Sequence, residues 1–256
     1  MPLRKRNTRI GPADIYYQVS GAGEPVVLVH GLSGSTRWWR YNVEALARHF
    51  QVYVIDLISF GRSRTGQRFV LRDAAASLTR WMERVGLERV RLVGHSMGGF
   101  IAADVAATFP DRVERLVLVD AAAIPMGRSY VAHVMGLARA VRRMPFDFFP
   151  VLFTDAYKAG PKAILRAAAE LLATDISERL TQIRAPVLIV WGEHDTVVPL
   201  QIGERLHASL PGSRLVVVPE AGHNPMWDRP GVFNREAVAF LTADLASISP
   251  PTSPDA

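Results

Sequence analysis

A serine set among closely spaced glycines has the surroundings that most clearly suggest chemistry. The segment Gly94-His95-Ser96-Met97-Gly98 follows the strand-like run 90–93 and opens a helical stretch rich in small residues. A tight strand-to-helix turn lifts the serine hydroxyl above the sheet edge, and only small neighbours two positions away leave room for it. The following helix N-terminus favours developing negative charge. We expect Ser96 to be a nucleophile.

A serine hydroxyl is a weak nucleophile and needs a base within hydrogen-bond reach, which in turn needs an orienting partner. Of the seven histidines, His223 stands out because it directly follows the last strand-like run. That position lies at the carboxyl edge of an open α/β sheet, where catalytic groups gather. The others lie in glycine-flanked turns, in helical stretches or, for His194, beside a better acid candidate. We expect His223 to be the general base.

An acid that orients the base is expected at Asp195, in the turn after the apolar run Val187–Val190. An aspartate there could instead cap the helix that follows. Glu193 and Asp120 are the alternatives for the acid, the latter at the end of another expected strand.

Backbone donors for an oxyanion are expected from two loops. One is the N–H of Met97, directly after the nucleophile. The other is the N–H of Leu32, because the glycines of His30-Gly31-Leu32-Ser33-Gly34 let that loop fold back over the site. Both groups are main-chain donors, so the oxyanion hole does not depend on side-chain identity.

The elements that position these residues follow from alternating strand-like and helical stretches, which favour a mostly parallel, doubly wound sheet. Runs such as Leu116–Val119 are apolar throughout, as in strands covered by helices on both faces. We expect the first two strands, 14–19 and 25–30, to form an antiparallel edge. The other expected strands are 51–56, 89–94, 115–120, 186–191 and 214–219, and the helices are 37–49, 71–85, 97–109, 200–209 and 232–245.

Residues 121–184 interrupt the alternation of strands and helices, because they contain helical patterns at 130–143 and 161–174 but no strand-like run. We expect them to form a helical cap inserted between two strands, dividing the α/β core into residues 1–120 and 185–246. Residues 247–256 are expected to be a disordered tail. The many apolar residues between 126 and 157 predict an apolar pocket wall, and hence a hydrophobic acyl or alcohol group in the substrate.

Composition excludes several classes. The chain has 256 residues, a net charge of +6 and no cysteine, so disulfides, thiolate metal sites and a cysteine nucleophile are excluded. The basic cluster within residues 4–9 is expected to be a solvated arm, and no nucleic-acid-binding motif accompanies it. No apolar run is long enough to span a membrane and no signal sequence is evident, so a cytoplasmic location is expected. Arg139, Arg142 and Arg143 form either a solvated helix face or a membrane-surface patch.

Together the elbow, the glycine loop at 30–34, Asp195 and His223 resemble the α/β-hydrolase superfamily over essentially the whole chain. The order serine, acid, histidine is the order of that family. The chain is most similar to capped serine hydrolases and esterases. This resemblance implies Ser96, Asp195 and His223 as the catalytic triad, Leu32 and Met97 as the oxyanion hole, and no metal or organic cofactor. The segment Asp56–Ser63 matches the family's D-x-x-G-x-G-x-S turn incompletely, because Ile58-Ser59 stands where the family usually has Pro-Gly.

Several activities share such a triad. A serine in the elbow argues against haloalkane dehalogenases and epoxide hydrolases, which use aspartate there. Carbon–carbon bond hydrolases typically carry tryptophan where this chain has Asn224. We therefore expect hydrolysis of small hydrophobic carboxylic esters, ahead of carbon–carbon hydrolysis or cofactor-free perhydrolysis. A ligand receptor without turnover is the alternative from another class. The oligomeric state is left open.

Overall fold

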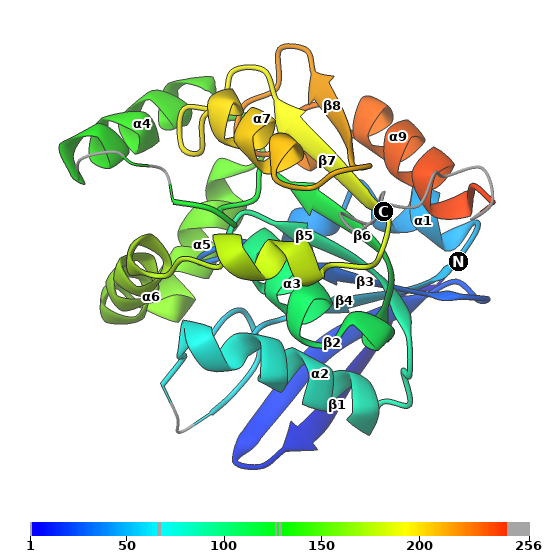
Figure 1. Ribbon diagram of the computed structural model, residues 1–256. Coiled ribbons are helices and arrows are strands. Elements are labelled where there is room, and N and C mark those ends of the chain that lie inside the picture. Colours follow the sequence, from blue (N-terminus) through cyan, green and yellow to red (C-terminus); the bar gives the residue numbers. More distant parts are fainter. Residues whose placement is uncertain (1, 66–67, 126, 128–129, 245–256) are drawn as a thin grey trace.

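The computed structural model describes residues 2–65, 68–125, 127 and 130–244, with only the backbone course for 130–134. Its centre is an eight-stranded sheet in the order β1-β2-β4-β3-β5-β6-β7-β8 (Figure 1). From β4 to β8 in this order neighbouring strands are parallel, which confirms the mostly parallel α/β-hydrolase sheet. The strands are β1 (Arg4–Ile10), β2 (Ala13–Ser20), β3 (Pro25–Val29), β4 (Gln51–Ile55), β5 (Val90–His95), β6 (Val113–Val119), β7 (Val187–Gly192) and β8 (Arg214–Val218).

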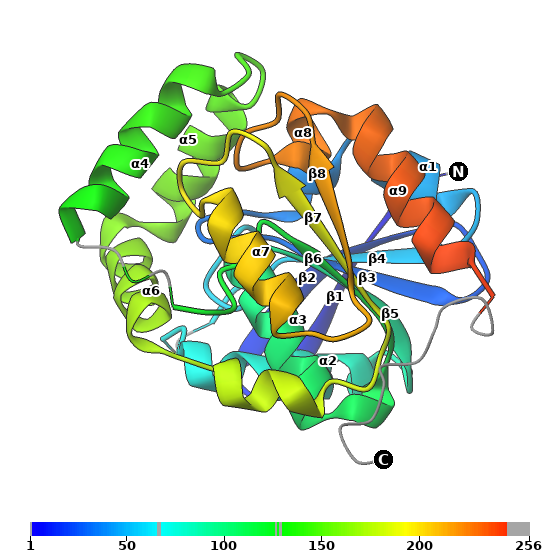
Figure 2. The same cartoon turned by 45° about the horizontal axis from the view of Figure 1, so that its top comes forward.

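Helices cover both faces of the sheet (Figure 2). In β3, Val26 and Leu28 pack into the apolar cluster of α1, α8 and α9, whereas Val27 and Val29 pack into that of α2, α3 and α7. This two-sided burial explains why the central strands are apolar throughout. The helices outside the β6–β7 connection are η1 (Thr36–Trp39), α1 (Val43–Ala47), η2 (Leu71–Asp73), α2 (Ala74–Arg84), α3 (Met97–Thr108), η3 (Pro110–Arg112), α7 (Leu200–Ala208), α8 (Pro225–Asp228) and α9 (Pro230–Thr242).

Two expectations about the N-terminal edge are wrong. The basic residues expected in a solvated arm belong to β1, which pairs antiparallel with β2. Most side chains of β1 are exposed, so the strand carries no apolar alternation. In addition, β2 pairs with β4 and not with β3. After β2 the chain turns at Gly21, where a Cβ would lie 2.1 Å from the carbonyl oxygen of Phe50, and crosses to the sheet centre.

The connection between β6 and β7 contains α4 (Tyr130–Arg143), α5 (Phe149–Ala159), α6 (Pro161–Ala173) and η4 (Ser177–Gln182). In both views α4, α5 and α6 lie on one side of the molecule. The sequence patterns predicted α4 and α6 but not α5. Pro150 lies in the first turn of α5, where the missing N–H of proline costs no helical hydrogen bond.

A buried carboxylate holds α5 to the rest of the fold. Asp155 is 1% exposed, accepts a hydrogen bond from the Ser35 hydroxyl at 2.7 Å and pairs with Arg37 at 2.5 Å.

No helix within the described residues is both long and apolar enough to cross a bilayer. The expected tail, 247–256, lies outside the described residues.

Candidate active site

Ser96 joins β5 to α3 in a strained conformation, with φ of 54° and ψ of −118°. A residue with a side chain rarely adopts such a positive φ. Close packing keeps the turn in place: a Cβ on Gly94 would lie 2.2 Å from the carbonyl oxygen of Gly98, and one on Gly98 would lie 2.5 Å from that of His30. The two glycines therefore let the strand, the helix and the loop after β3 converge around the serine.

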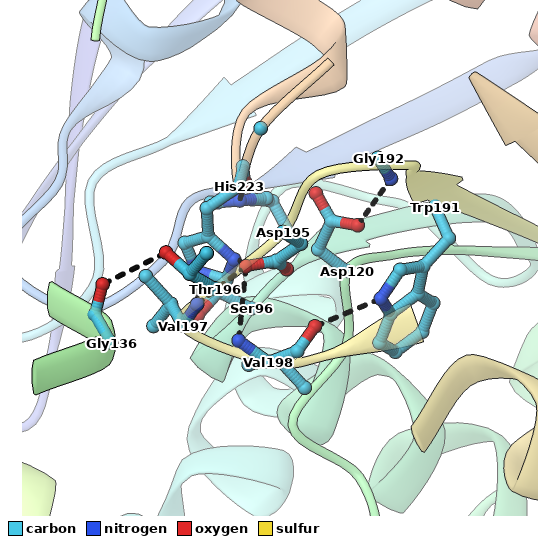
Figure 3. Close-up of polar contacts among 12 residues, drawn as sticks. Ser96, Asp120, Gly136, Trp191, Gly192, Asp195, Thr196, Val197, Val198 and His223 are labelled. Carbon is cyan, nitrogen blue, oxygen red and sulfur yellow. Dashed lines mark hydrogen bonds and ion pairs between the residues drawn. The ribbon is translucent and has the colours of Figure 1, made fainter. Parts of the chain in front are cut away.

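Side chains from three separate loops meet at this turn (Figure 3). The Nε2 atom of His223 lies 3.0 Å from the Oγ atom of Ser96, and its Nδ1 atom lies 2.7 Å from the Oδ2 atom of Asp195. An ionised carboxylate only accepts hydrogen bonds, so Nδ1 carries the proton and the lone pair of Nε2 faces the serine hydroxyl. The structure thus brings together the three residues chosen from the sequence.

Asp195 is held by the turn that contains it. Its Oδ1 atom accepts the backbone N–H groups of Val197 at 2.8 Å and Val198 at 3.0 Å, which leaves Oδ2 for His223 (Figure 3). The indole N–H of Trp191 donates to the carbonyl of Val198 and fixes the same turn. Asp195 does not cap α7, because that helix begins at Leu200 with Pro199 as its N-cap residue.

The two expected oxyanion donors are available. Among the described residues, neither the N–H of Leu32 nor that of Met97 donates to a protein acceptor. Met97 is the first residue of α3, so its N–H has no partner within the helix. A Cβ at Gly31 would lie 3.1 Å from the Cβ of Ser96, so the loop after β3 passes close to the nucleophile.

Neither alternative acid is hydrogen-bonded to the imidazole of His223, whose ring nitrogens face Asp195 and Ser96. Glu193 is 45% exposed and accepts the N–H of Glu220. Asp120 is fully buried and accepts the N–H of Gly192 at 2.8 Å. Burial, aided by the negative charge of Asp195, raises the pKa of Asp120 well above its ordinary value. Asp120 lies buried behind Asp195, bound to the main chain of β7.

His95, which the sequence suggested only as a structural turn residue, contacts the base itself. Its Nε2 atom donates to the carbonyl oxygen of His223 at 2.7 Å, and the two rings lie 4.9 Å apart. Burial, together with the nearby ring of His223, holds the pKa of His95 well below its usual range. A neutral imidazole next to Ser96 therefore fixes the backbone of His223.

Asp228 is a further carboxyl that the sequence did not single out. It accepts the N–H of Gly222 at 2.8 Å and so ties α8 to the loop of His223. Burial raises the pKa of Asp228 to about 6, against the opposing effect of this hydrogen bond. Together with Arg143, His194 and His223 it lines a small cavity beside the base.

Within the described residues, one set of three potential metal ligands lies close together, namely His95, Asp120 and His223. Both ring nitrogens of His223 are already engaged by Ser96 and Asp195. His223 therefore has no free ring nitrogen to offer a cation in this arrangement.

Residues 26–236 match the model of the alpha/beta hydrolase family. The chain belongs to this family. It is therefore a hydrolase, with the fold that the sequence indicated. The match runs from strand β3 into helix α9 and includes the helices inserted between β6 and β7.

Relatives of this chain in the family carry different names. The putative carbamate hydrolase RutD of Azorhizobium caulinodans is 30% identical over 254 residues, covering 90% of this chain and 96% of the relative. The 2-hydroxy-6-oxononadienedioate/2-hydroxy-6-oxononatrienedioate hydrolase of Paraburkholderia phymatum is 30% identical over 266 residues, covering 89% and 90%. The crystal structure of Est816, an N-acyl homoserine lactone degrading enzyme, superposes with a TM-score of 0.81 at 26% identity, covering 92% and 100%.

Proposed function

We propose that the protein hydrolyses carboxylic esters with a small hydrophobic acyl or alcohol group. The observation that carries this proposal is the hydrogen-bonded chain from Asp195 through His223 to the hydroxyl of Ser96. The similarity to Est816 supports ester chemistry, because a lactone is a cyclic ester.

In the proposed reaction, the Oγ atom of Ser96 attacks the ester carbonyl carbon while Nε2 of His223 takes the hydroxyl proton. The tetrahedral intermediate collapses, its carbon–oxygen bond to the alcohol breaks, and His223 protonates the leaving oxygen. Water then attacks the acyl-enzyme and gives its proton to His223. The acid is released as Ser96 recovers its proton.

The N–H groups of Leu32 and Met97 are proposed to hold the oxyanion in both steps. Removing one such donor from a serine hydrolase typically lowers the rate by about 10²–10³-fold. The strained turn at Ser96 supports this role, because it presents the serine oxygen beside the free N-terminus of α3.

We propose residues 121–184 as a cap over a core formed by 1–120 and 185–246. Two hydrogen bonds among others join this segment to loops of the site. The hydroxyl of Thr196, next to Asp195, donates to the carbonyl of Gly136 in α4 at 2.8 Å, and Asp155 of α5 binds the loop after β3 through Ser35. Helices placed there would determine which substrates reach Ser96.

Sustained hydrolysis of 4-nitrophenyl butyrate tests the proposal. We expect many product equivalents per enzyme, and a loss of about 10³-fold or more in Ser96→Ala with the fold unchanged. The matched control is Ser209→Ala, an exposed serine at the end of α7. A stoichiometric burst that stops would favour a receptor, and no acyl transfer at all would contradict ester chemistry.

Carbon–carbon bond hydrolysis is the second candidate, favoured by the similarity to the Paraburkholderia phymatum hydrolase. Against it, Asn224 directly follows the base, where we expect tryptophan in such enzymes. A comparison of kcat/KM for the butyrate ester and for a 2-hydroxy-6-oxodienoate decides between them. A higher value for the dienoate would reverse the ranking.

A further inference from the structure

Exposed apolar side chains gather on one part of the molecule. Of ten large hydrophobic side chains that are exposed in the described residues, eight lie between 135 and 172. The most exposed are Phe146, Tyr157 and Phe153, at 94%, 88% and 67%. The expectation that these aromatic residues line an apolar pocket is therefore wrong for these three.

The apolar residues belong to defined outward faces. On α5, Phe153 and Tyr157 are one turn apart, while Val151 and Asp155 on the opposite side of the helix are buried. Helix α5 therefore already has a packed face, and its second apolar face points outward. In soluble proteins, a concentration of exposed apolar side chains in one region marks a candidate interaction surface.

In the same segment, the basic side chains face solvent, whereas the acidic side chains bind groups of the core. All six basic residues between 135 and 172 are exposed, and none forms an ion pair within the described part of the chain: Arg139, Arg142, Arg143, Lys158, Lys162 and Arg166. The three acidic residues all bind core groups. Asp155 binds Ser35 and Arg37, Glu170 accepts the N–H of Leu71, and Asp147 accepts hydrogen bonds from Tyr41 and Trp227.

We propose that the outer surface of α4, α5 and α6 docks on a lipid surface with anionic headgroups. Exposed apolar side chains amid unpaired cations match the boundary between negative headgroups and acyl chains. The apolar residues project from three helices and a connecting turn, and a fluid lipid surface accommodates such scattered side chains without preformed pockets. A second copy of this surface would be repelled, because it carries the same positive charge.

This surface borders the active site. Arg143 and Met144 at the end of α4 line the small cavity that His223 also lines. Docking would therefore place the site beside the lipid, where hydrophobic esters concentrate. That consequence rests on the proposed function, whereas docking itself does not.

Co-sedimentation with vesicles tests the docking, using the Ser96→Ala protein so that no lipid is hydrolysed. We expect binding to vesicles of phosphatidylcholine mixed with phosphatidylglycerol, little binding to pure phosphatidylcholine, and release by salt. Arg142→Gln with Lys158→Gln and Lys162→Gln should weaken binding by at least about ten-fold, since each basic residue near such a surface contributes about a five-fold gain in affinity. Phe153→Ser with Tyr157→Ser should also weaken it.

The matched control is Arg4→Gln with Lys5→Gln and Arg6→Gln, which removes the same charge from the exposed strand β1 at the far sheet edge. This variant should bind as the parent does. The proposal would be overturned by equal binding to both lipids, by no binding, or by a loss of binding in the β1 variant alone. It would also be overturned if the protein bound an acidic protein but no lipid. Hydrolysis of a water-soluble ester by the parent enzyme reports separately on the proposed function.

Discussion

At the residue scale, the proposed nucleophile, Ser96, occupies a backbone conformation that most residues avoid. Strain of this kind costs about 1–3 kcal/mol and persists where the surroundings impose it. At Ser96 they do so through Gly94 and Gly98, which allow main-chain contacts that any Cβ would block. The strained turn at Ser96 thus lowers the stability of the fold, and it points the serine hydroxyl toward His223.

Relief of this strain can be measured with Ser96→Gly. Glycine adopts positive φ freely, so this variant should be more stable than Ser96→Ala by about 1 kcal/mol, while both lack activity. Urea unfolding of the two variants checks the difference. If the glycine variant is instead about 1 kcal/mol less stable, as for glycine in an ordinary helix, the turn is not strained.

His95 should act as a positioning residue for the base. Removal of its hydrogen bond to the carbonyl of His223 in His95→Leu should lower kcat by about 10²-fold, with little change in KM, because small misplacements of a base are costly. His95→Gln, which keeps a donor, should recover part of the loss. Equal losses in both variants, or a change in KM alone, would contradict this role.

Asp228 should make stability depend on pH. Its pKa is raised from 3.8 to about 6, so between these values the folded protein binds more protons than the unfolded chain. Its contribution to the free energy of unfolding therefore falls as pH rises from about 4 to about 6, by roughly 3 kcal/mol at most.

Asp228→Asn keeps an acceptor for Gly222 but cannot ionise. Urea unfolding of both proteins across this pH range measures the effect. The wild-type free energy of unfolding minus that of the variant should decrease as pH rises. A difference that does not vary with pH would show that burial does not raise the pKa of Asp228.

At the element scale, the elbow depends on contacts between main-chain segments. Gly98→Ala would force β3 away from α3, because its Cβ meets the carbonyl oxygens of Val29 and His30 at 2.5 Å. We expect a destabilisation of at least about 2 kcal/mol in urea unfolding. Gly231→Ala on α9 is the control, since a Cβ there meets nothing within 4 Å. Equal effects of the two substitutions would contradict this packing.

Sequence predicted the elements that carry a strong local signal. The central strands were found because burial on both faces makes them apolar throughout, as in β6. Strand β1 was missed because an exposed edge strand needs no apolar residue, and α5 because its two apolar faces hide the helical period. The pairing of β2 with β4 depends on a crossing at Gly21 that no local pattern records.

At the scale of the whole molecule, the three proposed catalytic residues lie far apart in sequence and meet only in the fold. Residue type, chain order and position after a strand were enough to choose Ser96, Asp195 and His223. The contacts of His95 and Asp228 were not predictable, because they join side chains to main-chain atoms of the His223 loop. The direction of the cap side chains was not predictable either, since an apolar pocket wall and an apolar outer face have the same composition.

The central claim is that Ser96 is activated by His223 and Asp195 acting together. The most direct test is the rate of covalent labelling by a fluorophosphonate, followed by intact mass and peptide mapping. We expect one adduct on Ser96 in the wild-type protein, none in Ser96→Ala, and labelling slowed by about 10²-fold or more in His223→Ala. Labelling at another residue, or a wild-type rate without His223, would contradict the account.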